Sequence, residues 1–162
     1  MSRKIAYGGI FAALALLMGY VEAMIPLPLP AGVKLGLSNV VVVLCLYTLG
    51  GRAAFGISLV RVVLAALLFK GFLSFWYSCA GALLSFAVMV LAKRSGHFSI
   101  RGVSMLGGVS HNVGQMVVAV LFLGRAVVLT LSPLLLVSGL LAGFGIGLVS
   151  ERCIRYVQQR KG

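Results

Sequence analysis

The chain has 162 residues, of which 61% are hydrophobic and only 10% are charged. Soluble domains carry about 25% charged residues, so this composition excludes a soluble globular protein and indicates an integral membrane protein. Fourteen Lys and Arg residues against two acidic residues give a net charge of +12. The basic residues fall mainly between and beyond apolar runs, which is typical of membrane topology, so we expect no nucleic-acid partner.

Six apolar segments follow one another along the chain. A bilayer core of about 30 Å needs about 20 apolar residues per helical crossing, so this length allows six short-looped crossings and no soluble domain. We therefore expect an all-α integral membrane protein, one six-transmembrane-helix bundle over residues 1–162. The predicted helices are Ile5–Ile25, Gly36–Leu49, Ala53–Phe69, Phe72–Ala92, Val103–Leu123 and Ala126–Ser150.

Basic residues divide unequally between the two ends of this bundle. Three lie at one end, Lys34, Lys70 and Arg125. Ten lie at the other: Arg3, Lys4, Arg52, Lys93, Arg94, Arg101, Arg152, Arg155, Arg160 and Lys161. The positive-inside rule then predicts a multi-pass protein of the cell inner (cytoplasmic) membrane with both termini in the cytoplasm.

The loop after the first helix contains Pro26, Pro28 and Pro30, followed by Lys34. Alternating prolines fix an extended backbone and end the preceding helix. This external loop has two interpretations: a lid that carries a cation over a site between helices, or a rigid connection between two membrane helices.

Small residues recur at four-residue spacing in the first helix, where Gly8 pairs with Ala12 and Gly9 with Ala13. Such pairs allow another helix to approach closely. The approaching helix belongs either to this bundle or to another subunit. Glycines 139, 143 and 147 repeat the spacing in the last helix, where we predict helix packing.

Arg61 lies in the middle of the third apolar segment. A charge at the centre of a membrane helix costs about 2.5–3.5 kcal/mol on insertion scales and faces a partner or a cavity. Two counter-ions are open to it: Glu22, near the outer end of the first helix, or an anionic substrate held by the guanidinium fork.

The fifth segment places His111, Asn112 and Gln115 along one helical stripe. Polar groups at membrane depth need partners, and this cluster favours a lined cavity over isolated packing residues. Asn39 and the aromatic pair Trp76–Tyr77 are candidates to complete its wall. The predicted substrate-binding residues are Glu22, Lys34, Asn39, Arg61, His111, Asn112 and Gln115.

Catalytic and cofactor patterns are missing from the sequence. It has no Walker motif and no aspartate, which excludes the Asp-rich Mg²⁺–diphosphate sites of prenyl chain elongation. Cys45, Cys79 and Cys153 fit neither a disulfide framework nor a zinc site. We therefore expect a non-catalytic binding protein without cofactor or metal.

Five segments carry a resemblance to a known family: PAGVKLGLSN at 30–39, LYTLGG at 46–51, LLFKGFLS at 67–74, AGALLSFAVM at 80–89 and GGVSHNVGQ at 107–115. Together they resemble the Gx transporter family, also labelled heptaprenyl diphosphate synthase component I. Members look like substrate-binding (S) components of energy-coupling factor (ECF) transporters, which are six-helix membrane proteins powered by a separate membrane scaffold and cytoplasmic ATPases.

The resemblance implies that the chain captures a small anionic or amphipathic solute from outside the cell. It also implies that the first helix docks on the scaffold through Gly8, Gly9, Ala12 and Ala13, although these differ from the family's usual paired alanines. Two alternatives stay open. The chain is a non-catalytic subunit associated with a prenyl diphosphate synthase or isoprenoid and quinone metabolism, or a membrane subunit of a quinone- or flavin-linked electron-transfer system.

Overall fold

The computed structural model describes residues 2–24 and 36–159. These residues form the helices α1 (Ser2–Met24), α2 (Leu37–Thr48), α3 (Gly51–Ala65), α4 (Gly71–Ser95), α5 (Ile100–Leu123) and α6 (Arg125–Gln159), with a π-helical segment η1 (Ala66–Lys70) between α3 and α4. The six predicted helices are confirmed, and α6 continues past the predicted end at Ser150. Pro26, Pro28, Pro30 and Lys34 lie outside the described residues.

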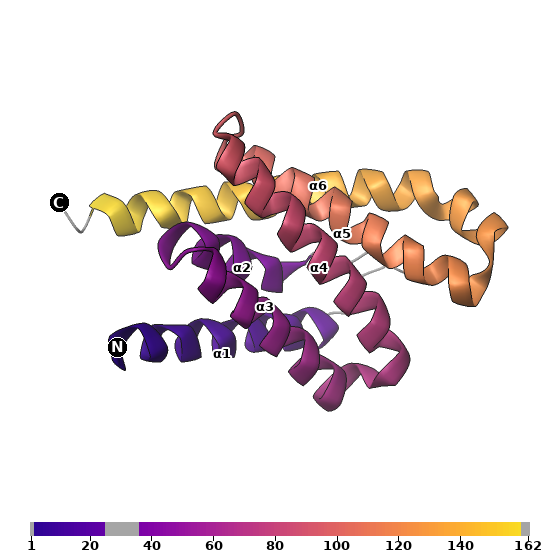
Figure 1. Cartoon of the computed structure of the whole chain (residues 1–162), viewed down its shortest axis with the longest axis horizontal. Helices are drawn as coiled ribbons and strands as arrows, with labels where there is room; N and C mark the ends of the chain where they lie inside the picture. Colours follow the sequence, from indigo (N-terminus) through magenta and orange to yellow (C-terminus); the bar gives the residue numbers. More distant parts are fainter. Residues whose placement is uncertain (1, 25–35, 160–162) are drawn as a thin grey trace.

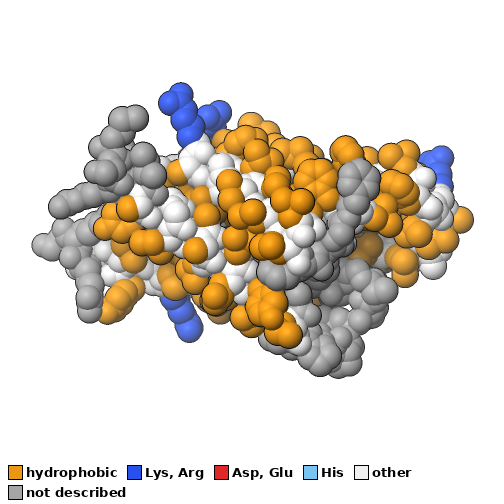
Figure 2. Space-filling model, turned by 90° about the horizontal axis from the view of Figure 1, so that it is seen from below, with side chains coloured by type: hydrophobic (Ala, Val, Ile, Leu, Met, Phe, Trp, Pro, Cys, Tyr) orange, Lys and Arg blue, Asp and Glu red, His pale blue; other side chains and the backbone are white. Residues whose placement is uncertain are grey.

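Four of the described helical stretches are long and apolar enough to cross a membrane: Gly51–Leu68, Leu73–Ser95, Ile100–Leu123 and Arg125–Gln159. Hydrophobic side chains cover most of the face in Figure 2, and Lys and Arg side chains stand toward its two ends. Figure 1 places both chain termini at the same end of the bundle. This is the surface of a multi-pass membrane protein.

Helix α2 is short and lies inside the bundle. Its 12 residues span roughly 18 Å at 1.5 Å per residue, less than the thickness of a bilayer core. Val41, Val42, Val43, Cys45 and Leu46 are almost fully buried and form the centre of the hydrophobic core. An apolar run without a polar face suits a helix surrounded by others, so α2 is a core helix more than a crossing of its own.

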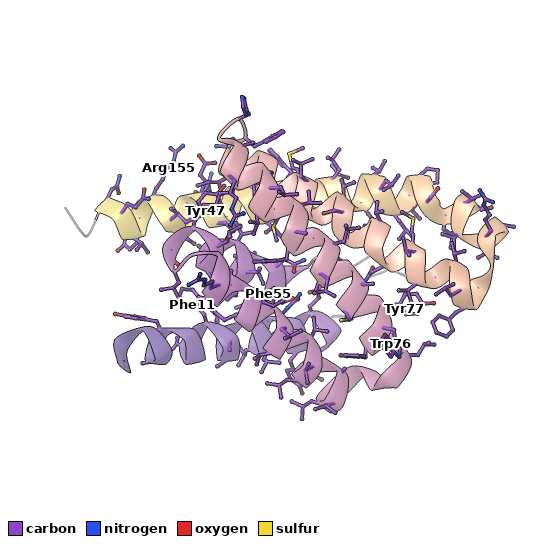
Figure 3. All side chains as sticks on the ribbon, in the orientation of Figure 1. Phe11, Tyr47, Phe55, Trp76, Tyr77 and Arg155 are labelled. Atoms are coloured by element: carbon purple, nitrogen blue, oxygen red, sulfur yellow. The ribbon has the colours of Figure 1, made fainter. Side chains whose placement is uncertain are left out.

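The two ends of α2 are closed by side chains of opposite charge. At the first end, the carboxylate of Glu22 in α1 accepts the backbone N–H groups of Gly36 and Leu37 at 2.6 Å and 3.1 Å. At the last, Lys93 of α4 donates to the carbonyl of Leu46 at 2.6 Å. Negative charge at a helix N-terminus and positive charge at its C-terminus both stabilise the helix dipole. The ammonium of Lys93 also lies 4.5 Å from the ring centre of Tyr47 (Figure 3).

Close backbone contact joins α5 to α6, as predicted from the glycine spacing. A Cβ on Gly139 would come within 2.7 Å of the Gly108 carbonyl oxygen, and one on Gly143 within 2.7 Å of the Ser104 carbonyl oxygen. A Cβ on Gly147 would meet the backbone of Arg101 at 2.7 Å. The prediction that these three glycines serve helix packing is confirmed.

The small residues of α1 behave differently. A Cβ on Gly8 or Gly9 would have no neighbouring atom within 4 Å among the described residues. Ala13 is exposed, whereas Ala12 packs against the core. Of the two interpretations of this stripe, packing within the bundle therefore applies to Ala12 and not to Gly8, Gly9 or Ala13.

At the end of the bundle that carries both termini, Glu151 of α6 bridges two arginines. Its carboxylate accepts hydrogen bonds from the Nε of Arg101 in α5 and from a guanidinium nitrogen of Arg155, which lies four residues along α6. Because Glu151 joins α5 to α6 away from the centre of the bundle, its ion pairs are structural.

Candidate functional site

A cavity of about 70 Å³ lies in the middle of the bundle, and all six α-helices or their caps contribute to its wall. It is set midway along α5 and α6 and beside the first turn of α2. Its lining consists of Glu22, Gly36, Ser38, Asn39, Arg61, Val62, Ala65, Ser78, Gly108, His111, Asn112, Gln115, Gly139, Ala142, Gly143 and Ile146.

Six of the predicted binding residues meet in this one cavity: Glu22, Asn39, Arg61, His111, Asn112 and Gln115. They come from α1, α2, α3 and α5, which are far apart in sequence. The seventh, Lys34, lies outside the described residues. That these residues share a cavity is a finding, and that they bind a substrate stays a prediction.

Arg61 sits in the middle of the continuous helical stretch Gly51–Lys70 and reaches the first turn of α2. One of its terminal guanidinium nitrogens donates a hydrogen bond to the hydroxyl of Ser38. Its Nε is buried and donates to no acceptor among the described residues. The guanidinium thus brings an unsatisfied donor and a positive charge into the centre of an apolar bundle, where an unpaired charge is costly.

Glu22 lines the same cavity but forms no ion pair with Arg61. Both of its carboxylate oxygens accept backbone N–H groups at the start of α2. Among the described residues, the ion pairs of acidic side chains are those of Glu151 with Arg101 and Arg155. The structure therefore does not contain the direct Arg61–Glu22 pair that the sequence left open.

The polar residues of α5 differ in whether their side chains already have hydrogen-bond partners in the protein. The side-chain amide of Asn112 donates to the carbonyl of Leu135 at 2.5 Å, which ties α5 to α6. The side chains of Asn39 and Gln115 line the cavity and form no hydrogen bond with the described residues. Amides can both donate and accept, so Asn39 and Gln115 are suited to a polar group in the cavity.

Sequence reasoning chose the wrong residues of α4 for the cavity wall and missed the wall supplied by α6. Ser78 lines the cavity, whereas the neighbouring Trp76 and Tyr77, considered as wall residues, do not. The ring centre of Tyr77 instead lies 6.0 Å from the ring centre of Phe122 in α5. Tyr77 is near the end of the bundle away from the termini (Figure 3). The glycines of α6 could have predicted its part in the cavity wall. A helix that packs closely on α5 beside the polar residues must also border the cavity that those residues line.

Most of the chain matches a known protein family. The family described as heptaprenyl diphosphate synthase component I covers residues 11–153. The chain belongs to the heptaprenyl diphosphate synthase component I family. The match includes the lining residues of every helix. No curated protein and no solved structure is similar enough to this family member to be matched.

The size and chemistry of the cavity in this family member limit what it can hold. A buried water needs roughly 10–15 Å³ in this measure, so the cavity has room for the equivalent of a few waters. That space suits a small molecule or the head group of a larger one. No cluster of three or more His, Cys, Asp or Glu side chains exists among residues 2–24 and 36–159 that could hold a metal ion. The groups present are a guanidinium, amides, hydroxyls and an imidazole, a set that fits an anionic ligand.

Proposed function

We propose that this chain is the membrane-embedded substrate-binding (S) component of an ECF-type importer, and that its cavity binds the anionic group of a small anionic or amphipathic solute. The single observation that carries the proposal is the state of Arg61. Its Nε is buried without an acceptor among residues 2–24 and 36–159, and the neighbouring carboxylate of Glu22 binds backbone N–H groups of α2.

A cation at this depth needs an anion, and the described residues offer no direct one. Insertion scales put a charged arginine at a helix centre at about 2.5–3.5 kcal/mol, and the Coulomb attraction of the nearby Glu22 is smaller than the cost of burial. A chain retains such a cost for a purpose such as ligand binding. A carboxylate or phosphate would accept from the Arg61 Nε and the adjacent guanidinium nitrogen in bidentate fashion. Asn39 and Gln115 would orient the remaining polar atoms of the solute.

Transport through such a protein needs energy from elsewhere, because the sequence has no Walker motif. We propose that α1 docks on a membrane scaffold that carries cytoplasmic ATPases, using the face that contains Gly9 and Ala13. Support comes from the absence of any described atom within 4 Å of a Cβ on Gly9 and from the exposure of Ala13. In this proposal both termini face the cytoplasm and the chain lies in the inner membrane.

Native mass spectrometry of the purified protein tests ligand capture. We expect wild type to carry a co-purifying anion and Arg61→Met to lose it, since a hydrogen bond to a charged group is worth about 1.5–3 kcal/mol. Arg52→Met is the matched control, because Arg52 is in the same helix but exposed and outside the cavity. Equal ligand occupancy in wild type and a folded Arg61→Met protein would refute the proposal.

Affinity purification tests the partner. Gly9→Leu should prevent co-purification of scaffold and ATPase subunits while leaving ligand binding unchanged, because a bulky side chain holds apart two helices that must approach closely. Gly145→Leu in α6 is the control, since a Cβ there also has no described neighbour within 4 Å. Partner recovery that is the same for Gly9→Leu and Gly145→Leu would exclude α1 docking.

A second candidate is favoured by the family description. The chain would then be a non-catalytic membrane subunit that binds an isoprenoid diphosphate for a separate prenyl diphosphate synthase. The same cavity would hold the diphosphate, so the two candidates differ in partner and not in site chemistry. Recovery of a soluble synthase in the purification, in place of ATPase and scaffold subunits, would favour this second candidate.

A further inference from the structure

The start of α2 already binds an anion, and that anion is a side chain of the protein itself. Helix N-termini attract negative charge through unpaired backbone N–H groups and the helix dipole. Here the carboxylate of Glu22 takes this place, with Gly36 N–H at 2.6 Å and Leu37 N–H at 3.1 Å. Glu22 also lines the cavity, so the helix end and the cavity share one boundary.

A second observation points to a ligand at this boundary. Arg61 donates to Ser38, which lies in the first turn of α2, and its buried Nε has no acceptor among the described residues. The unsatisfied guanidinium and the N-terminus of α2 are therefore neighbours. Both the guanidinium and the helix N-terminus favour a negative charge. In the described part of the chain, the carboxylate of Glu22 is the one acidic group at this place, and it contacts the backbone of α2 and not Arg61.

We propose that the anionic group of the ligand, a carboxylate or a phosphate, binds between Arg61 and the N-terminus of α2 and displaces Glu22. This inference rests on the proposed binding function and assigns Glu22 a different role from the one predicted from sequence. Glu22 is an internal competitor for the anion site and not a ligand contact. Two anions at one helix end repel each other, so ligand and Glu22 occupy it in turn.

Displacement of Glu22 has a consequence for α1. The hydrogen bonds from Gly36 and Leu37 are the ones that tie α1 to the start of α2 among the described residues. Ligand binding breaks them, so α1 loses its hydrogen bonds to the start of α2, while its buried Ala15 stays packed in the core. Because α1 also carries the open face with Gly8, Gly9 and Ala13, the site and the partner-facing helix are linked through one carboxylate.

The sign of a mutational effect on affinity tests the competition. Titrations use acetate, inorganic phosphate and inorganic diphosphate as probes, with wild type, Glu22→Gln and the control Glu151→Gln, which removes the other acidic side chain of the chain. Glu22→Gln should bind the preferred probe at least about tenfold more tightly, the equivalent of one charge-assisted hydrogen bond no longer displaced. Glu151→Gln should bind as wild type does.

Weaker binding by Glu22→Gln would mean that Glu22 contacts the ligand, and unchanged binding would mean that it is a fixed helix cap. Either result overturns the competition while leaving an Arg61-dependent binding site intact. Failure of wild type to bind any of the three anions would instead count against the proposed binding function, and the competition would fall with it.

A measurement on the wild-type protein tests the competition without relying on a variant that could fail to fold. The chain has two acidic side chains, so ¹³C-glutamate labelling gives an infrared spectrum with two carboxylate signals, and Glu151→Gln assigns them. The same preferred anion should shift the Glu22 carboxylate stretch and leave the Glu151 stretch unchanged. Arg61-dependent binding with no change at Glu22 would overturn the inference alone.

Discussion

Two regions of the molecule use a carboxylate among arginines, with different results. Near the end that carries both termini, Glu151 accepts from Arg101 and Arg155, so acid and bases satisfy one another. In the centre of the bundle, Glu22 and Arg61 line the same cavity, yet the carboxylate contacts backbone N–H groups and the guanidinium contacts a serine. The contrast shows that nearness of opposite charges does not decide their pairing when a helix terminus competes for the anion.

The difference also separates structure from binding. The Glu151 cluster is complete as it stands, and nothing further is needed to satisfy it. The central region retains a buried Nε without an acceptor among the described residues. A buried donor without an acceptor is one that a ligand can satisfy, which is why we propose the binding site at Arg61 and not at the arginines that contact Glu151.

The largest stability effect should come from Glu22→Ala. Removing the carboxylate leaves the N–H groups of Gly36 and Leu37 without their acceptor inside the membrane, which should cost roughly 1–3 kcal/mol of unfolding free energy. Reversible unfolding in mixed micelles measures this loss, with Glu22→Gln as an intermediate case because its carbonyl can still accept one bond. A Glu22→Ala protein as stable as wild type would show that the cap does not hold α2.

A smaller effect is expected for Arg61→Met, within about 1 kcal/mol of wild type, since the loss of the Ser38 bond is offset by removal of a buried charge. The informative quantity is the coupling between Arg61→Met and Glu22→Gln in a double-mutant cycle. We expect a coupling of about 1 kcal/mol, because the charge of Glu22 acts on Arg61 across the cavity but the two side chains form no direct ion pair. A coupling of several kcal/mol, with the double variant recovering stability, would restore the direct pair as the correct description.

The smallest stability effect is expected for the ion pairs of Glu151 with Arg101 and Arg155, although these have the most charged contacts. Arg155→Met should leave the unfolding midpoint almost unchanged, because Arg155 is 69% exposed and exposed ion pairs contribute little and are screened by salt. Arg101→Met should lower the midpoint slightly more, because its pair with Glu151 is partly buried. Measurement at low and at high salt would detect whatever remains. A large, salt-independent loss would place Glu151 in the same class as Glu22 and remove the contrast between the two regions.

Much of this architecture could be predicted from the sequence. Apolar segments of the right length gave the helices, and Arg61, His111, Asn112 and Gln115 stood out because polar residues in a membrane segment need partners. The cavity does bring these four together with Glu22 and Asn39. Glycine spacing in α6 correctly indicated close helix packing, and the structure identifies α5 as the partner helix.

What could not be predicted depends on how helices cross. Whether Glu22 meets Arg61 or the start of α2 is decided by ångström-scale placement of α1 against α2, which no local pattern encodes. The burial of α2 follows from its packing against α1, α3 and α6, and its sequence reads equally well as a membrane crossing. From the sequence, Lys93 is interpreted only as an indicator of membrane topology. In the structure its ammonium also donates a hydrogen bond to the Leu46 carbonyl at the C-terminal end of α2.

The most direct test of the central claim is an experimental structure of wild-type protein purified with its natural ligand. We predict an anionic group of that ligand within hydrogen-bonding distance of the Arg61 Nε, at the N-terminus of α2, with the Glu22 carboxylate moved away from Gly36 and Leu37. A structure in which Arg61 forms a direct ion pair with Glu22, and the ligand binds elsewhere or contacts neither, would contradict the account.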